Sequence, residues 1–134
     1  MTPRSKTTVW LRAASVLAIL FGLMTLKEGG TTLFGDEAAR AAAGAYVPFV
    51  LWFNFVAGFF YIVASIALWQ HRAWAGALSL GIALATALAF AAFGIHVLMG
   101  GAYEMRTVAA MALRSGIWLA IGMLAWRARP ASAR

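Results

Sequence analysis

The sequence predicts an all-α membrane protein, a single domain (1–134) built as a bundle of four transmembrane helices. Of its 134 residues, 63% are hydrophobic and 11% charged, whereas soluble domains average about 45–50% apolar and about 25% charged residues. Four apolar runs are each close to the roughly 20 residues that cross a bilayer. The basic residues gather at the ends of these runs, so the net charge of +7 indicates membrane topology rather than nucleic-acid binding.

The first apolar run predicts a helix over residues 8–28. Basic residues precede it, as in a signal peptide, but the nearest alanine-rich stretch (38–45) lies too far along the chain for ordinary cleavage. We therefore expect this segment to remain as the first transmembrane helix. The adjacent Gly29 and Gly30 are typical of a helix end.

The other three runs predict helices over 47–70, 73–99 and 103–126. Residues 70–72 join the second to the third, and Gly100-Gly101 interrupts the chain before the fourth. Such short connections favour antiparallel neighbours, giving an up-down-up-down bundle, and leave 29–46 as an external loop or short helix. The third helix is predicted to be the packing core because small residues run along it: Gly81, Ala85, Ala89, Ala83, Ala87 and Ala91.

The distribution of charge predicts the orientation. The side holding both termini carries seven basic residues (Arg4, Lys6, Arg12, Arg72, Arg127, Arg129 and Arg134), and the other side carries three (Lys27, Arg40 and Arg106). By the positive-inside rule, both termini are expected in the cytoplasm. We accordingly expect a multi-pass protein of the bacterial inner membrane.

Arg114 is the strongest functional indication in the sequence, because it lies inside the apolar stretch 107–126. An arginine at the centre of a transmembrane helix costs about 2.5–3.5 kcal/mol on translocon scales, so it normally faces a partner, a cavity or a bound molecule. Counting 1.5 Å per residue from the cytoplasmic helix ends places Glu28 and Asn54 at roughly 24 Å, and Thr86 and Arg114 at roughly 20 Å. The four helices thus each offer a polar group to a common layer, with Lys27 beside Glu28.

This polar layer has two interpretations. Glu28 and Arg114 form a buried ion pair that fixes the helix register, or they line an outward-opening pocket where Arg114 binds a carboxylate, a phosphate or a quinone oxygen. Trp118, one turn beyond Arg114, either stacks on the guanidinium or fills the core.

A second titratable group (His96, Glu104 and Arg106) is expected at the outer rim. His96 and Glu104 are weak candidates for a metal site. The alternatives are a histidine bonded to a loop carbonyl and a glutamate that stabilises a helix N-terminus.

No catalytic motif is present. The chain lacks cysteine, which excludes thiolate metal sites and CxxC redox chemistry, and it contains no nucleophile–base arrangement, phosphate-binding glycine loop or HExxH. Enzymatic activity would therefore require a larger complex or a bound cofactor, and the sequence does not identify one.

Two segments carry a resemblance to a known family. The first helix ends in FGLMTLKEGG and the second contains GFFYIVASIALW; with the four-span layout from about Arg12 to Trp126, they resemble the DoxX-like family of small bacterial membrane proteins. Asn54 is the only strongly polar residue of the second apolar stretch, where that family often has an acidic one. The resemblance implies association with redox or quinone-linked membrane systems.

These observations favour a non-catalytic accessory subunit in contact with membrane lipids, forming a homo-oligomer or part of a larger complex. The alternative is a small-molecule or proton-coupled transporter or binder for a quinone, a lipid or an anion. No nucleic-acid partner is expected.

Overall fold

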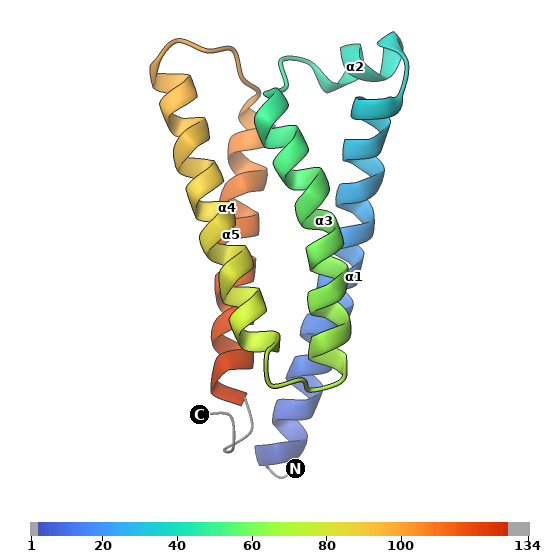
Figure 1. Ribbon diagram of the computed structural model, residues 1–134, viewed down its shortest axis with the longest axis vertical. Helices are drawn as coiled ribbons and strands as arrows, with labels where there is room; N and C mark the ends of the chain where they lie inside the picture. The colour runs from blue at the N-terminus through green and yellow to red at the C-terminus, as the bar shows by residue number, and fades with distance from the viewer. Residues whose placement is uncertain (1–2, 129–134) are drawn as a thin grey trace.

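The computed structural model describes residues 3–128, with side chains from Lys6 onward, and these residues form helices joined by turns. Four long helices, α1 (Pro3–Phe34), α3 (Pro48–Trp69), α4 (Ala75–Leu98) and α5 (Met105–Ala128), run along the long axis (Figure 1). The short helix α2 (Glu37–Ala43) lies across one end of the bundle. The start of α1 and the end of α5 both lie at the opposite end.

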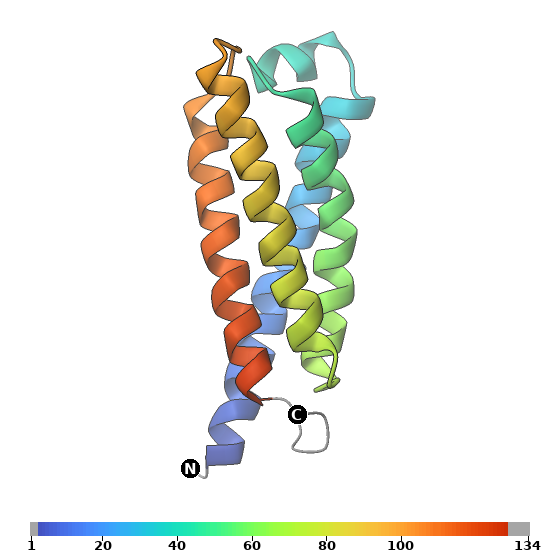
Figure 2. The same ribbon diagram turned by 60° about the vertical axis from the view of Figure 1, so that its left-hand side comes forward.

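The long helices pack as two pairs, α1 with α3 and α4 with α5. Figure 2 shows the four helices side by side, with consecutive ones running in opposite directions. The pairs meet mainly through α3 and α4, whereas α1 and α5 touch only sparsely. This sparse contact leaves space between α1 and α5 for a cavity.

Helix α1 is longer than the predicted 8–28 at both ends, because it begins at Pro3 and continues through Gly29 and Gly30 to Phe34. Gly29 serves close packing instead of ending the helix: a Cβ there would lie 3.2 Å from the side chain of Phe55. The bounds of the other three long helices agree with the prediction to within about two residues. The predicted external loop contains α2, whose first turn is capped by the Asp36 carboxylate, which accepts from Ala39 N–H at 3.0 Å.

Small residues bring α1 and α3 close together. A Cβ on Gly22 would lie 3.1 Å from the carbonyl oxygen of Gly58, so the two backbones approach closely here. Nearer the start of α1, Ser15 and Ser65 bond reciprocally: each hydroxyl donates to the other residue's carbonyl oxygen, at 2.7 Å from Ser15 and 2.9 Å from Ser65.

The predicted role of the small residues on the third helix is wrong in its detail. Of the six residues named for the packing core, only Ala83 is buried, and a Cβ on Gly81 would meet nothing within 4 Å. The buried face of α4 instead includes Ala75, Gly76, Ser79, Ile82, Thr86 and Phe93. The spacing of small residues along α4 indicated two possible packing faces, but α4 packs against α5 through a different face.

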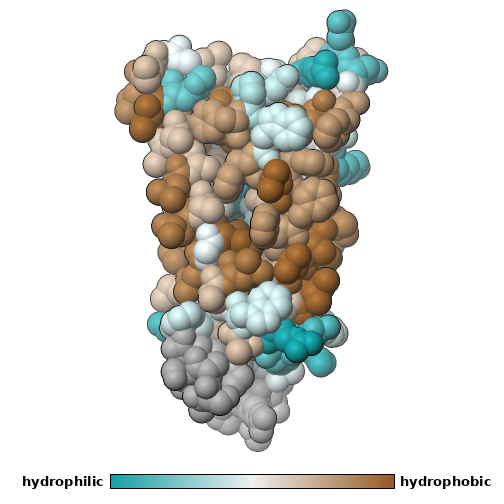
Figure 3. Space-filling model, in the orientation of Figure 1, coloured by the Kyte–Doolittle hydropathy of each residue, from teal (hydrophilic) through white to brown (hydrophobic). Residues whose placement is uncertain are grey.

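The surface fits a membrane environment. Each of the four long helices is long and apolar enough to cross a bilayer, and a hydrophobic band occupies the middle of the molecule with hydrophilic side chains toward both ends (Figure 3). Aromatic rings of α3, among them Trp52, Phe59 and Phe60, are exposed. The chain is thus a candidate multi-pass membrane protein. Arg129 and Arg134, two of the basic residues that set the predicted orientation, lie outside the described residues.

Candidate functional site

A cavity of about 640 Å³ lies at the α2 end of the bundle. Its walls come from α1, α3 and α5, while Ala39, Ala42 and Ala43 of α2 also line it. The volume falls within the roughly 300–1,000 Å³ of typical small-molecule sites. Four of the sequence-predicted layer residues line it together: Lys27, Glu28, Asn54 and Arg114.

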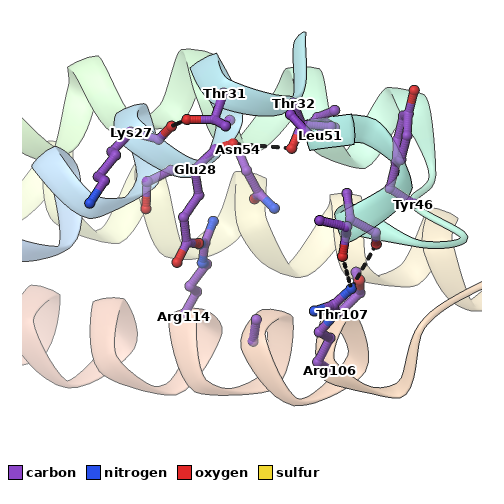
Figure 4. Close-up of a pocket in the computed structure, with 16 residues that line it drawn as sticks. Lys27, Glu28, Thr31, Thr32, Tyr46, Leu51, Asn54, Arg106, Thr107 and Arg114 are labelled. Atoms are coloured by element: carbon purple, nitrogen blue, oxygen red, sulfur yellow. Dashed lines mark hydrogen bonds between the residues drawn. The ribbon is translucent and has the colours of Figure 1, made fainter. Parts of the chain in front are cut away.

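Arg114 is the buried charge of this cavity. Only 9% of the residue is exposed, and within residues 3–128 its buried Nη1 finds no hydrogen-bond partner. Glu28 of α1 and Arg114 of α5 point toward one another across the cavity (Figure 4), but among the described residues they form no ion pair. Glu28 itself is exposed. Glu28 and Arg114, the predicted ion pair, therefore line the same cavity without forming that pair.

Asn54 adds a second unused polar atom. Its Oδ1 is buried and, in the described part of the chain, has no partner. Asn54 enters the cavity from α3, and Lys27 of α1 also lines it, although its exposed side chain extends away from Asn54 and Arg114 (Figure 4). A buried polar group without a partner costs about 1–3 kcal/mol, so Asn54 is a second cavity residue that the bundle leaves unsatisfied.

The other two residues of the predicted layer do not line this cavity. Thr86 is fully buried, and its hydroxyl donates to Ile82 O at 2.7 Å in its own helix. Trp118 packs against Tyr61, with ring centroids 4.8 Å apart, which makes it a core residue. Helix periodicity alone did not show which face of α4 meets α5.

Tyr61 is the polar residue that the sequence reasoning missed. It is fully buried, and its hydroxyl lies near Arg114, Thr86 and Trp118, yet it makes no hydrogen bond of good geometry among the described residues. The indole N–H of Trp118 is likewise unpaired there. Tyr61 lies in an apolar, aromatic-rich stretch of α3, where nothing in the sequence distinguishes it from the other rings.

Polar contacts hold α2 over the cavity. Arg106 of α5 donates from Nη2 to the carbonyl oxygens of Ala42 and Ala43 at 3.0 and 2.8 Å (Figure 4), and Glu104 Oε1 accepts from Ala45 N–H at 2.8 Å. Between these contacts Gly44 has φ 72°, and a Cβ there would collide with the Glu104 carboxylate. Arg40 of α2 also donates to the carbonyl oxygens of Thr32 and Leu33 at 3.4 Å. Since α2 buries no residue of its own, these polar contacts rather than apolar packing position it.

His96, Glu104 and Arg106, the residues predicted at the outer rim, form hydrogen bonds with the backbone of the connecting segments. Glu104 bonds to the backbone of the loop, and Arg106 bonds to the backbone of α2. His96 bonds through Nε2 to Ala102 O at 2.9 Å, which is the predicted alternative of a histidine bonded to a loop carbonyl. Among the described residues, no three His, Cys, Asp or Glu side chains gather to hold a metal ion. Arg106 also lines the cavity, so it contacts both the covering helix and the cavity.

The charges around the cavity are unequal. Its lining includes three cations (Lys27, Arg106 and Arg114) and one carboxylate, that of Glu28. Hydroxyl groups of Thr31 and Thr32 donate to their own helix at 2.7 and 3.2 Å, so their oxygens keep accepting capacity. A positive, partly apolar cavity lined by a buried guanidinium is suited to binding an oxygen-bearing small molecule.

Comparison of the chain with known protein families, with curated proteins and with solved structures finds no match. The cavity's own chemistry therefore carries the functional argument.

Proposed function

We propose that this chain is a multi-pass protein of the bacterial inner membrane that binds a small molecule at Arg114. Its orientation follows from the charge distribution, with both termini in the cytoplasm, so the α2 end and the cavity face the outer side. The occupant reaches Arg114 from the outer leaflet or from the outer aqueous phase.

The burial of Arg114 with Nη1 unpaired is the observation that carries this proposal. A guanidinium with a purely structural role would be bonded to a partner in the bundle, because an uncompensated charge in an apolar environment is costly. The bundle pairs Ser15 with Ser65, while the hydroxyls of Ser79 and Tyr61 and the indole N–H of Trp118 are also buried without a partner among the described residues. Arg114 differs from these three residues because it carries a full charge and lines the cavity. A molecule bound in the cavity would compensate the charge of the guanidinium, because Arg114 lines that cavity.

Native mass spectrometry tests the proposal directly. The protein is extracted from its native membrane in lipid nanodiscs, and the wild type is expected to retain a bound small molecule that Arg114→Gln loses. Arg72→Gln is the matched control, because Arg72 is exposed in the turn at the far end of the bundle. An adduct of equal occupancy in Arg114→Gln, or no adduct in the wild type, contradicts the proposal.

A second proposal is the accessory role in a larger complex. It is favoured by the exposed aromatic rings of α3, which offer a surface to a neighbouring protein as well as to lipid. The same spectra report protein stoichiometry, so a defined oligomer or a constant partner that Phe59→Ala with Phe60→Ala disrupts would support this role. A monomer without partners would contradict it.

A further inference from the structure

The cavity of Arg114 has three properties that restrict the chemistry of its occupant: its charge, its size and the depth of its guanidinium. The inference drawn from them rests on the proposed function, that is, on Arg114 binding a small molecule.

The charge favours an anion over a neutral carbonyl compound. Nη1 of Arg114 has no partner in the described structure, and Glu28, on the opposite wall, is exposed and forms no ion pair with it. A neutral quinone would accept a hydrogen bond but leave the buried charge uncompensated. An oxyanion in the cavity compensates that charge, and its hydrogen bonds with a guanidinium are shorter and roughly twice as strong as those between neutral groups.

The number of charges favours a phosphate ester over a carboxylate. With Lys27, Arg106 and Arg114 set against Glu28, the lining has an excess of two positive charges. A phosphate monoester carries about −1.5 to −2 at pH 7, which matches that excess, whereas a carboxylate neutralises half of it.

The size favours an organic molecule over an inorganic ion. A cavity of about 640 Å³ corresponds to a drug-sized ligand, and apolar residues such as Leu51 and Ala110 share its walls with the charged groups. The phosphate alone would leave most of this volume to water.

The depth places the phosphate at the base of the cavity. Arg114 lies eight residues beyond Arg106 along α5, hence about 12 Å deeper, and it is buried where Arg106 is exposed. Arg106 uses Nη2 to hold Ala42 and Ala43, and its remaining N–H groups are available to a ligand beneath α2.

From these properties we propose that the cavity binds an organic phosphate monoester, with the phosphate on Arg114 and the organic part extending toward Arg106 and α2. The same phosphate chemistry has two sources, the headgroup of an anionic lipid in the outer leaflet and a soluble sugar or glycerol phosphate.

Thermal unfolding in phosphatidylcholine nanodiscs separates these sources. One sample contains phosphatidic acid as a minor lipid, a second receives glycerol 3-phosphate in the buffer, and a third receives decylubiquinone as a neutral probe. We expect one of the phosphates to raise the unfolding midpoint of the wild type, with an apparent Kd at least tenfold weaker in Arg114→Gln and unchanged in Arg72→Gln. Arg114→Lys, which keeps the charge but loses the planar fork, should retain part of the binding.

Stabilisation by phosphatidic acid alone assigns the lipid source, and stabilisation by glycerol 3-phosphate assigns the soluble one. If decylubiquinone stabilises the protein through Arg114 and neither phosphate does, the phosphate class is wrong while the proposed binding function stands. If neither phosphate shifts the midpoint, the inference is overturned, and the Arg114-dependent adduct in native mass spectrometry decides separately on the proposed function. Equal stabilisation of wild type and Arg114→Gln by a phosphate also overturns it.

Discussion

The serine contact between α1 and α3 and the cavity at Arg114 are two places where polar side chains enter the same apolar bundle. Ser15 and Ser65 satisfy each other within 2.9 Å, and glycines nearby keep their helices close. Arg114 and Asn54 are also buried or aimed into the interior, yet each has a polar atom without a partner in the described structure. We call the serine contact closed because its hydroxyls are bonded within the protein, and the Arg114 site open because these two atoms are not.

The two regions are expected to respond differently to substitution. A closed pair exchanges bonds with water for bonds within the protein and contributes modest stability. An open site costs stability in the empty protein and recovers it when a ligand binds. Substitutions in the two regions should therefore change stability in opposite directions.

The largest expected effect is at Arg114. Arg114→Met should raise the stability of the ligand-free protein by about 1–4 kcal/mol, because replacing a buried charge by an apolar side chain of similar size removes its desolvation cost. Thermal unfolding of ligand-depleted protein in detergent measures the change. Arg72→Met, at an exposed position, should leave the midpoint nearly unaltered. A lower midpoint in Arg114→Met would show that the guanidinium has a structural partner after all.

The next effect concerns the closed region. Gly22→Leu should destabilise the protein by about 1–3 kcal/mol, because its side chain has to displace Ile62, Tyr61 and the Gly58 carbonyl, all of which have an atom within 3.2 Å of the place a Cβ would take. Gly116→Leu is the matched control on α5, since a Cβ there meets nothing within 4 Å. Equal unfolding midpoints for the two variants would contradict the close packing of α1 and α3.

A smaller loss is expected when the serine contact is opened. Ser65→Ala removes one of the reciprocal hydrogen bonds and should cost about 1 kcal/mol. Ser115→Ala should cost less, because the Ser115 hydroxyl donates only to Met111 O of its own helix, at 2.8 Å. The comparison uses chemical or thermal unfolding of both variants under one condition, and a larger loss in Ser115→Ala would reverse the assignment.

The smallest expected effect is confined to α2, the helix that covers the cavity. Gly44→Ala should loosen α2, because its Cβ collides with the Glu104 carboxylate and the residue has a positive φ. Hydrogen–deuterium exchange of residues 37–46 should accelerate while the four long helices keep their protection. Gly100→Ala, also at positive φ but with open space around it, controls for backbone strain alone; similar acceleration at 37–46 would exclude the Glu104 contact as the cause.

Parts of the candidate site followed from counting along the helices. Glu28, Asn54 and Arg114 were placed at a common depth, and the cavity contains all three. Thr86 shared the depth but not the cavity, because depth along a helix says nothing about the direction in which its faces point. Tyr61 was missed because a tyrosine in an apolar run resembles any other core aromatic until its neighbours are known.

The C-terminal end of α1 is a second feature that local sequence did not predict. Gly29 and Gly30 were expected to end the helix, since glycine lowers helix propensity by roughly 1 kcal/mol relative to alanine. Packing of Phe55 against Gly29 instead favours a residue without a side chain, and the helix continues to Phe34. Tertiary contact outweighed the local preference.

The sequence by itself determined four apolar helices, their approximate bounds and a costly arginine inside the last of them. Each of these features depends on the hydrophobicity and spacing of residues within one segment, so it can be predicted without knowing how the segments pack. The tertiary structure alone decided that α1 pairs with α3 and α4 with α5, that Glu28 and Arg114 do not join, and that α2 covers the cavity between them. Those outcomes depend on contacts between segments far apart in the chain, where packing selects one helix face among several of similar composition.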